Sequence, residues 1–315
     1  NNPLETVIGP RRLTLGGIGA VATDDVFRGR GLMSAQLLHV QSEMARKGFP
    51  LSILWGNRAR YGRYGWELTG RQEHFTLEAK QLDEIAPHIA DAVVDYNGSE
   101  PHRRTIDQLY RQHLLRQERI GTMTAAVLNR TIAEVRLVEG TSSPAYIVLD
   151  RRSQSPKVLE YGGAAEGFVR LVRDAMARAH ASGIEVIAPA GADDRITALC
   201  RREASFRRIA PLGMIRINAL AETLTAWRDV IDRRVSGLGR VRPVSLSIVG
   251  REEPAVRLGG EDGGEPIGLS LSEREMVRLV FGPLEPGGEI SLPGEAQWLE
   301  AIFPLPLYVW PLNHV

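Results

Sequence analysis

The stretch "LGGIGAVATDDVFRGRGLMSAQLLHV", residues 15–40, contains the pattern that decides the fold. Its first part, residues 15–23, is apolar and rich in glycine, which favours a buried strand. After the loop "RGRG" at residues 28–31, apolar residues recur every three or four positions over residues 33–44, as in an amphipathic helix. A second apolar run, "FPLSILW" at residues 49–55, follows. The order strand, loop, helix and strand predicts a parallel βαβ unit.

The same outline occurs a second time at residues 160–191, "EYGGAAEGFVRLVRDAMARAHASGIEVIAPAG". Within it, "MARAHASGIEVIAPAG" matches "MARKGFPLSILWGN" of the first copy with a short insertion. The later "CRREASFRR" falls where the first copy has "RYGRYGWEL". Because the copies lie far apart in the chain, we interpret them as a duplicated domain and not as a short solenoid repeat.

The remaining sequence predicts further short elements. Four strands are expected before the second helix, over residues 122–128, 133–139, 145–150 and 158–161.

A third region begins near residue 213 and mixes a strand, an amphipathic helix and three further strands. A helix is expected after Ser272, which forms a capping-box signature with Glu275. The apolar end "IFPLPLYVWPLNHV" is expected to be buried.

Composition excludes several classes of protein. The 315 residues are 43% hydrophobic and 24% charged, which suits a folded core. Lys and Arg number 39 against 38 Asp and Glu, so the marked basic excess of a nucleic-acid-binding protein is missing. The single cysteine, Cys200, excludes an internal disulfide, and the seven histidines show no metal-binding spacing, so no metal is expected. No apolar run reaches membrane-spanning length and no signal peptide opens the chain, so we expect a cytoplasmic protein without a membrane partner.

The arginine–glycine loop admits three interpretations. A glycine-rich loop between a strand and a helix presents backbone N–H groups and the positive end of the helix dipole, which together bind phosphate. The spacing fits neither GxxxxGK[ST] nor GxGxxG, so a nucleoside triphosphate or dinucleotide is not expected. A plain surface turn is the second interpretation. An RNA-binding segment is the third, although such segments repeat and lie in disordered sequence.

The surroundings of the loop favour phosphate. "AVATDDVFRGRGLMSAQLL" resembles the central motif of the GNAT acetyltransferases, an Arg-x-x-Gly-x-Gly/Ala loop that holds the pyrophosphate of acetyl-coenzyme A. Arg28, Gly31 and Met33 occupy its three positions, with Met33 where Gly or Ala is usual.

Downstream, "GNRARYGRYGWE" resembles the second signature of that superfamily, a tyrosine followed by x-x-x-Gly-aromatic. Tyr61, Gly65 and Trp66 fill it.

The combination of these motifs with a second, loop-less copy and an α+β end resembles the enhanced intracellular survival (Eis-like) branch. That resemblance implies an α/β (α+β) chain: tandem GNAT-type mixed sheets with flanking helices, and a small sterol-carrier-like α+β C-terminal domain. The expected division is residues 1–80, 81–212 and 213–315. A GNAT domain carries several elements before its loop-bearing strand, so the first domain is expected to lack its first elements.

The resemblance also implies the site residues. Tyr61 would be the general acid, since a phenol can protonate the departing thiolate; a packed core aromatic is the alternative. The carboxylate of Val315 would be the base for the amine, the alternative being a chain end in solvent. Asn57 would contact coenzyme, although a turn role fits equally. The expected coenzyme-binding residues are Val21, Thr23, Arg28, Gly29, Arg30, Gly31, Leu32, Met33 and Asn57.

The function implied is an acetyl-CoA-dependent N-acetyltransferase that transfers acetyl to a primary amine by direct attack in a ternary complex. The acceptor would be a small molecule or a peptide, and the chain would form a homo-oligomer. The second copy lacks both the arginine loop and the tyrosine, so it should neither bind coenzyme nor catalyse. A catalytically lapsed acyl-CoA-binding regulatory or scaffold protein is the alternative.

Overall fold

The computed structural model describes residues 2–82, 85, 92–119, 123–140, 142–260 and 264–314. The chain forms two compact units, one of residues 2–71 with 211–307, the other of residues 72–210 with 308–314. Two strands, β4 (Glu67–Glu78) and β11 (Phe206–Ile217), contribute residues to both. The division into three domains, residues 1–80, 81–212 and 213–315, stays a prediction.

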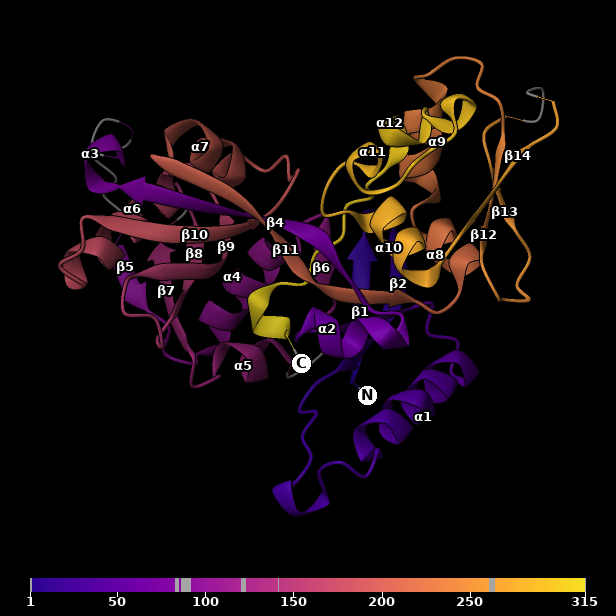
Figure 1. Ribbon diagram of the computed structural model, residues 1–315. Helices are drawn as coiled ribbons and strands as arrows, with labels where there is room; N and C mark the ends of the chain where they lie inside the picture. Colours follow the sequence, from indigo (N-terminus) through magenta and orange to yellow (C-terminus); the bar gives the residue numbers. More distant parts are fainter. Residues whose placement is uncertain are drawn as a thin grey trace. The chain divides into compact units, whose positions relative to one another are not determined.

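The first unit begins with a mixed sheet (Figure 1). β1 (Asn2–Ile8) and β2 (Arg11–Ile18) form an antiparallel hairpin, and β2 pairs in parallel with β3 (Leu51–Leu54). On its other side β3 pairs antiparallel with β11. Between β2 and β3 runs α1 (Leu32–Arg46), so the predicted parallel βαβ unit is confirmed.

The first predicted strand is shorter than expected. It was placed over residues 15–23, and β2 ends at Ile18. Ile18 pairs with Leu54, the last residue of β3, and no strand of the described residues pairs with the chain beyond it. The chain after β3 turns away, and the Trp55 indole donates a hydrogen bond to the Leu212 carbonyl, 2.8 Å away.

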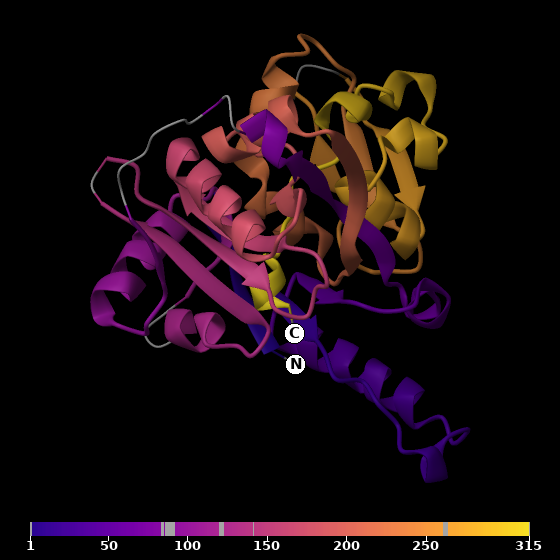
Figure 2. The same ribbon diagram turned by 90° about the vertical axis from the view of Figure 1, so that its left-hand side faces the viewer.

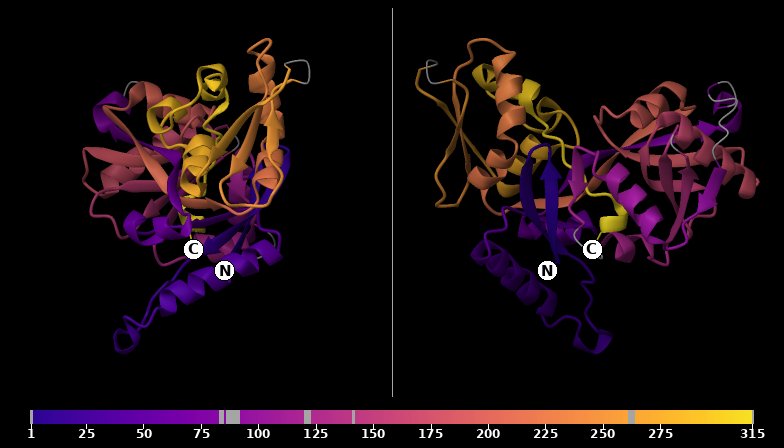
Figure 3. Two further views of the ribbon diagram at one scale, coloured as in Figure 1. Left: turned by 45° about the vertical axis from the view of Figure 1, so that its right-hand side comes forward. Right: turned by 180° about the vertical axis from the view of Figure 1, so that it is seen from behind.

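The rest of the first unit is a small α+β region (Figure 3). Its three-stranded sheet has the order β13-β12-β14. The capping box predicted at Ser272 and Glu275 is confirmed at the start of α10 (Glu273–Phe281). The other elements of this region are α8 (Leu220–Ala226), α9 (Arg228–Ser236), β12 (Val244–Ile248), β13 (Val256–Leu258), β14 (Ile267–Leu271), α11 (Pro286–Glu289), η4 (Gly294–Ala296) and α12 (Leu299–Ile302). A short helix outside this region, η2 (Gly62–Tyr64), comes just before β4.

The second unit has a larger mixed sheet. Its strand order is β5-β7-β8-β9-β10-β4, with β9 and β10 parallel and β10 antiparallel to β4. The helix α6 (Ala165–Arg178) packs across β7, β8 and β9 (Figure 2). Besides β4, these strands are β5 (Ala92–Asp95), β7 (Ala133–Glu139), β8 (Ala145–Asp150), β9 (Lys157–Gly163) and β10 (Gly183–Pro189). The short strand β6 (Leu115–Gln117) lies in the same unit but outside this strand order. The other helices are α3 (Ala79–Leu82), α4 (Glu100–Tyr110), α5 (Met123–Leu128), α7 (Arg195–Glu203) and η5 (Pro311–Asn313).

One predicted strand of this unit is wrong. The segment expected as a strand over residues 122–128 is the helix α5 over its described part. Its buried residues are Thr124, Val127 and Leu128, which follow the three-and-four spacing of a helix and not the alternation of a strand.

The apolar chain end is buried, as predicted, at Phe303, Leu305, Leu307, Val309 and Leu312. The thiol of Cys200 is also buried, and burial raises its pKa. Of the described helices, none has the length and apolar character needed to span a bilayer.

Candidate coenzyme and catalytic site

The connection between β2 and α1, residues 19–31, extends away from the strands (Figure 3). A short helix, η1 (Asp25–Phe27), is capped by Asp24, whose carboxylate accepts a hydrogen bond from Val26 N at 3.0 Å. Arg28 forms an ion pair with Asp25 at 2.5 Å, and both side chains are mostly exposed. The Arg30 guanidinium lies over the Phe27 ring, 5.5 Å from its centroid. Both arginines are therefore held at the surface of this loop.

Gly29 and Gly31 give the loop its path into the helix. Their φ angles are +76° and +74°, a region that favours glycine. A Cβ at either position would meet no atom within 4 Å, so both backbones face open space. Gly31 is the N-cap of α1, and no side chain among the described residues caps this helix. The turn into a helix N-terminus predicted for Arg28 to Met33 is confirmed, and its free N–H groups suit an anion.

The residues between β2 and the loop carry free backbone groups. Val21 and Thr23 are half-buried and lie beyond the strand. Among the described residues, their backbone N–H and C=O groups have no hydrogen-bond partner. Val21 and Met33 pack against the apolar cluster that contains Tyr61, whereas Leu32 is exposed. The structure thus places Val21 and Met33 against the apolar cluster to which Tyr61 belongs.

Tyr61 ends the one-turn helix α2 (Arg58–Tyr61). Its ring is 6% exposed and packs on Gly56, where a Cβ would lie 2.5 Å from Tyr61 Cε2. No described residue hydrogen-bonds to its hydroxyl. The Asn57 side chain accepts a hydrogen bond from Arg60 N at 3.2 Å and caps α2. This cap supports the turn interpretation of Asn57, and its contact with coenzyme stays a prediction.

The neighbouring Tyr64 behaves differently. Its hydroxyl lies 2.5 Å from Ser34 Oγ in the first turn of α1, and its carbonyl accepts a hydrogen bond from Gln41 at 2.7 Å. Tyr64 therefore ties the segment after α2 to α1. Of these two tyrosines, Tyr61 is the one whose hydroxyl is available for chemistry.

Sequence reasoning missed the charged support beneath α2. Glu67, 1% exposed, accepts hydrogen bonds from Arg58 and from Arg274 of α10. Burial alone would raise the pKa of Glu67, but the hydrogen bonds from Arg58, Leu68 N and Arg274 outweigh it and lower the pKa to about 2. The one indication in the sequence was a glutamate, Glu67, within the apolar pattern of a strand. Nothing in the sequence indicated that Arg274 would be its partner.

The second βαβ unit has no comparable loop. Ala164 alone separates β9 from α6. Its N–H donates to the Pro144 carbonyl at 2.9 Å, and a Cβ at Gly167 would lie 2.2 Å from the Ser143 carbonyl oxygen. The start of α6 is therefore packed against its own chain, which supports the prediction that this copy does not bind coenzyme.

The predicted base Val315 lies outside the described residues. The segment before it belongs to the second unit and is held there by Gln117. Gln117 Nε2 donates to the Tyr308 carbonyl at 3.0 Å, and its Oε1 accepts from Trp310 N at 3.0 Å and from Asn313 Nδ2 at 3.1 Å. Burial lowers the pKa of His314 to about 4, so this imidazole is neutral at neutral pH.

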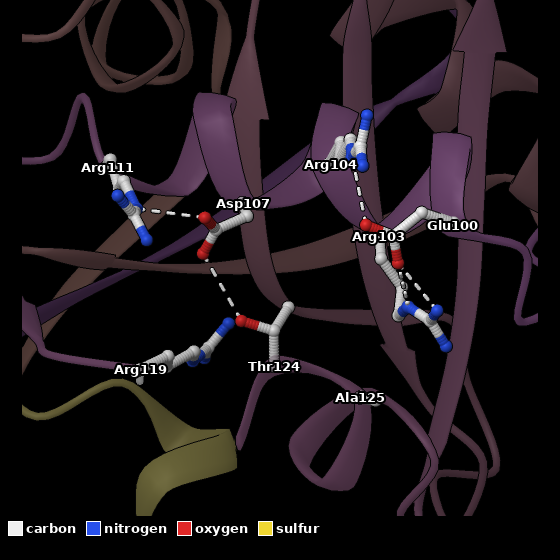
Figure 4. Close-up of a pocket in the computed structure, with 8 residues that line it drawn as sticks. All are labelled: Glu100, Arg103, Arg104, Asp107, Arg111, Arg119, Thr124 and Ala125. Carbon is white, nitrogen blue, oxygen red and sulfur yellow. Dashed lines mark hydrogen bonds and ion pairs between the residues drawn. The ribbon is translucent and has the colours of Figure 1, made fainter. Parts of the chain in front are cut away.

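A hollow of about 270 Å³ in the second unit is lined by arginines and carboxylates of α4 and by residues of α5 (Figure 4). Its charges are paired: Arg103 and Arg104 bind Glu100, and Arg111 binds Asp107. Arg119, which also lines it, binds the buried Glu160. A second hollow, of about 570 Å³, lies along β2 and α8. We place the candidate site at the loop and not in these hollows, because the loop offers uncompensated N–H groups. The described residues contain no cluster of His, Cys, Asp and Glu side chains suited to a metal.

Comparison with known proteins agrees with this geometry. Residues 2–69 match the family described as acetyltransferase (GNAT) domain. No curated protein sequence matches the chain.

Several solved structures share the fold. A GCN5-related N-acetyltransferase from Kribbella flavida is 18% identical with a TM-score of 0.65, over 98% of this chain and 83% of that one. A probable N-acyltransferase from Enterococcus faecalis is 17% identical with a TM-score of 0.66, over 98% and 83%. Eis1 from Mycobacterium abscessus is 13% identical with a TM-score of 0.65, over 100% and 86%. The chain therefore has the mixed α/β fold of GNAT-type acetyltransferases.

Proposed function

We propose that the chain is an acetyl-CoA-dependent N-acetyltransferase that acts on a primary amine. One observation carries the proposal: an uncapped helix N-terminus behind two glycines of positive φ shares an apolar cluster with a tyrosine of free hydroxyl. The match of residues 2–69 to the GNAT domain and the names of the structural neighbours support the same reaction class. The proposal includes membership of the Eis-like branch, a sterol-carrier-like C-terminal domain and assembly as a homo-oligomer.

The residues present fit the coenzyme. The N–H groups at the start of α1 would hold its pyrophosphate, with Arg28 and Arg30 adding positive charge. The free backbone groups of Val21 and Thr23 would bind the pantetheine arm in an extended form. Acetyl-CoA is the co-substrate and supplies the thioester. An adjacent part of the chain would place the amine for direct attack.

Tyr61 would act as the general acid. No described residue hydrogen-bonds to its hydroxyl, and a phenol can donate its proton to the sulfur as the carbon–sulfur bond breaks. The terminal carboxylate of Val315 would accept the proton of the attacking amine, directly or through water. The anchoring of Tyr308 to His314 by Gln117 supports a fixed position for the end of the chain.

The test is a thiol-release assay with acetyl-CoA and a panel of amines comprising a polyamine, an aminoglycoside and a lysine-containing peptide. Amine-dependent thiol release is expected, together with acetyl-CoA binding by calorimetry. Binding without turnover on any amine would contradict the enzyme and favour the acyl-CoA-binding scaffold. Salt-sensitive RNA binding in a filter assay would favour the third interpretation of the loop.

The base is tested by adding two glycines after Val315. If the terminal carboxylate accepts the amine proton, kcat should fall while the melting temperature and the Kd for acetyl-CoA stay unchanged. A two-glycine extension before Asn1 is the matched control. Unchanged turnover in the C-terminal extension would remove Val315 from the mechanism.

A further inference from the structure

The turn after Tyr61 is packed directly against the first residues of α10. A Cβ at Gly62 would lie 3.4 Å from the Arg274 guanidinium carbon. A Cβ at Gly65, where φ is +90°, would lie 2.0 Å from Glu273 Oε2. Both positions are glycines, so the two charged side chains reach the backbone of the turn. The start of α10 therefore fixes the path of the chain on leaving Tyr61.

One buried carboxylate joins the Tyr61 helix to α10. Glu67 Oε2 accepts from Arg58 Nη2 at 2.8 Å and from Arg274 at 2.6 and 2.7 Å. Arg58 is the first residue of α2 and Tyr61 is the last. A single helical turn is not stable alone, so its orientation depends on such contacts. Arg274 thus acts on the start of α2 through Glu67 and reaches the residue after Tyr61, Gly62, directly.

The neighbouring Glu273 is held equally firmly. Arg216 Nη2 donates to Glu273 Oε1 at 2.8 Å, and Arg251 donates to the same oxygen. Burial lowers the pKa of Arg216 although Glu273 opposes this. The α10 helix is further fixed by its capping box. A support that is itself rigid can hold a catalytic group within a fraction of an ångström.

We propose that Arg274 is a positioning residue for Tyr61, so that the α+β region at the end of the chain takes part in acetyl transfer in the first βαβ unit. The proposal rests on the function proposed above, in which Tyr61 is the acid. The guanidinium of Arg274 holds Glu67 and covers Gly62, and Glu67 holds α2 through Arg58. Loss of this link lets α2 and the Tyr61 hydroxyl drift from the thioester sulfur.

The experiment is a double-mutant cycle of Arg274→Gln with Tyr61→Phe, measured by thiol release. Arg274→Gln alone should lower kcat about tenfold, because a small misplacement of a catalytic group is enough. In the Tyr61→Phe background it should lower kcat less than twofold, because the group it positions is gone. The Kd for acetyl-CoA should stay unchanged, and Arg274→Lys should restore part of kcat.

Arg11→Gln is the matched control. Arg11 has the same side-chain exposure as Arg274, 39%, and makes a two-point ion pair with Asp229 at 2.8 and 3.0 Å in the same unit. It should leave kcat unchanged. A purely structural role for Arg274 would lower kcat by equal factors in both backgrounds, and that result would overturn the proposal.

Failure of the proposed function has a different signature. Absent turnover in the wild-type chain, or a Tyr61→Phe variant with full kcat, would overturn the acid assignment and this proposal with it. A large effect of Tyr61→Phe beside no effect of Arg274→Gln would overturn the positioning role alone.

Discussion

The two βαβ units are built alike and differ in what joins the strand to the helix. In the first, residues 19–31 form an exposed loop that delivers Gly31 to an uncapped helix. In the second, Ala164 alone makes the connection, and the helix start is covered by the chain at Ser143 and Pro144. The helix dipole is the same in both. The two units therefore differ in the open space before the helix and not in the helix itself, and this space is what the proposed phosphate site requires.

The same contrast separates the tyrosines. Tyr61, in the first compact unit, has a hydroxyl without a hydrogen-bond partner among the described residues. Tyr161 of the second unit is fully buried, its hydroxyl lies 2.6 Å from Thr197 Oγ1, and its ring contacts Phe168 and Trp310. Both rings are buried, but only the Tyr161 hydroxyl has a hydrogen-bond partner among the described residues.

Among these substitutions, Gly31→Asp should have the largest effect, the loss of acetyl-CoA binding. The substitution forces a positive φ on a residue with a Cβ and adds a negative charge where phosphate is expected. Calorimetry should detect no acetyl-CoA binding. Gly9→Asp is the control, because Gly9 also has a positive φ (+56°) and open space around it but lies in the β1–β2 turn. Equal loss of binding in both variants would mean that strain, not the loop, is responsible.

Tyr61→Phe should lower kcat about 10²-fold and leave the Kd for acetyl-CoA unchanged, since general-acid catalysis is lost and the packing is kept. Tyr161→Phe in the second unit should keep kcat and lower the free energy of unfolding by about 1 kcal/mol through the lost hydrogen bond. Steady-state kinetics and denaturant titration measure the two effects. Wild-type turnover in Tyr61→Phe would return Tyr61 to the core-aromatic interpretation.

Arg28→Gln should have the smallest effect, about fivefold in the Kd for acetyl-CoA, because an exposed charge contributes little and is screened by salt. The loss should shrink further at high ionic strength. Arg46→Gln, at the other end of the same helix, removes a similarly exposed arginine with an i,i+3 acidic partner. A similar weakening of acetyl-CoA binding in Arg46→Gln would show that Arg28 acts only through the overall charge of the protein.

The sequence predicted the strands and helices of the two βαβ units well because each unit is formed by one continuous stretch of the chain. Met44 and Leu37 of α1 are buried as their spacing indicates, and the strand, helix and strand follow in order. The end of β2 was placed too late, since an apolar run shows what can be buried and not where a partner strand stops. The α5 segment was misassigned because its run is short.

The site was predicted in part for a related reason. The two glycines lie in one short motif and Tyr61 lies in a second, so the neighbours of each could be inferred. Arg274 lies 207 positions from Glu67, and no periodicity links them. Pairing between distant charged residues is decided by the tertiary fold, which a single sequence does not display.

The pairing of β3 with a strand far along the chain has a consequence for synthesis of the protein. β3 pairs on one side with β2, its neighbour in sequence, and on the other with β11, which is translated more than a hundred residues later. Until β11 leaves the ribosome, that side of β3 presents unpaired backbone groups. The nascent first unit therefore carries an unpaired strand edge until β11 has been made, and such an edge can pair with another nascent chain.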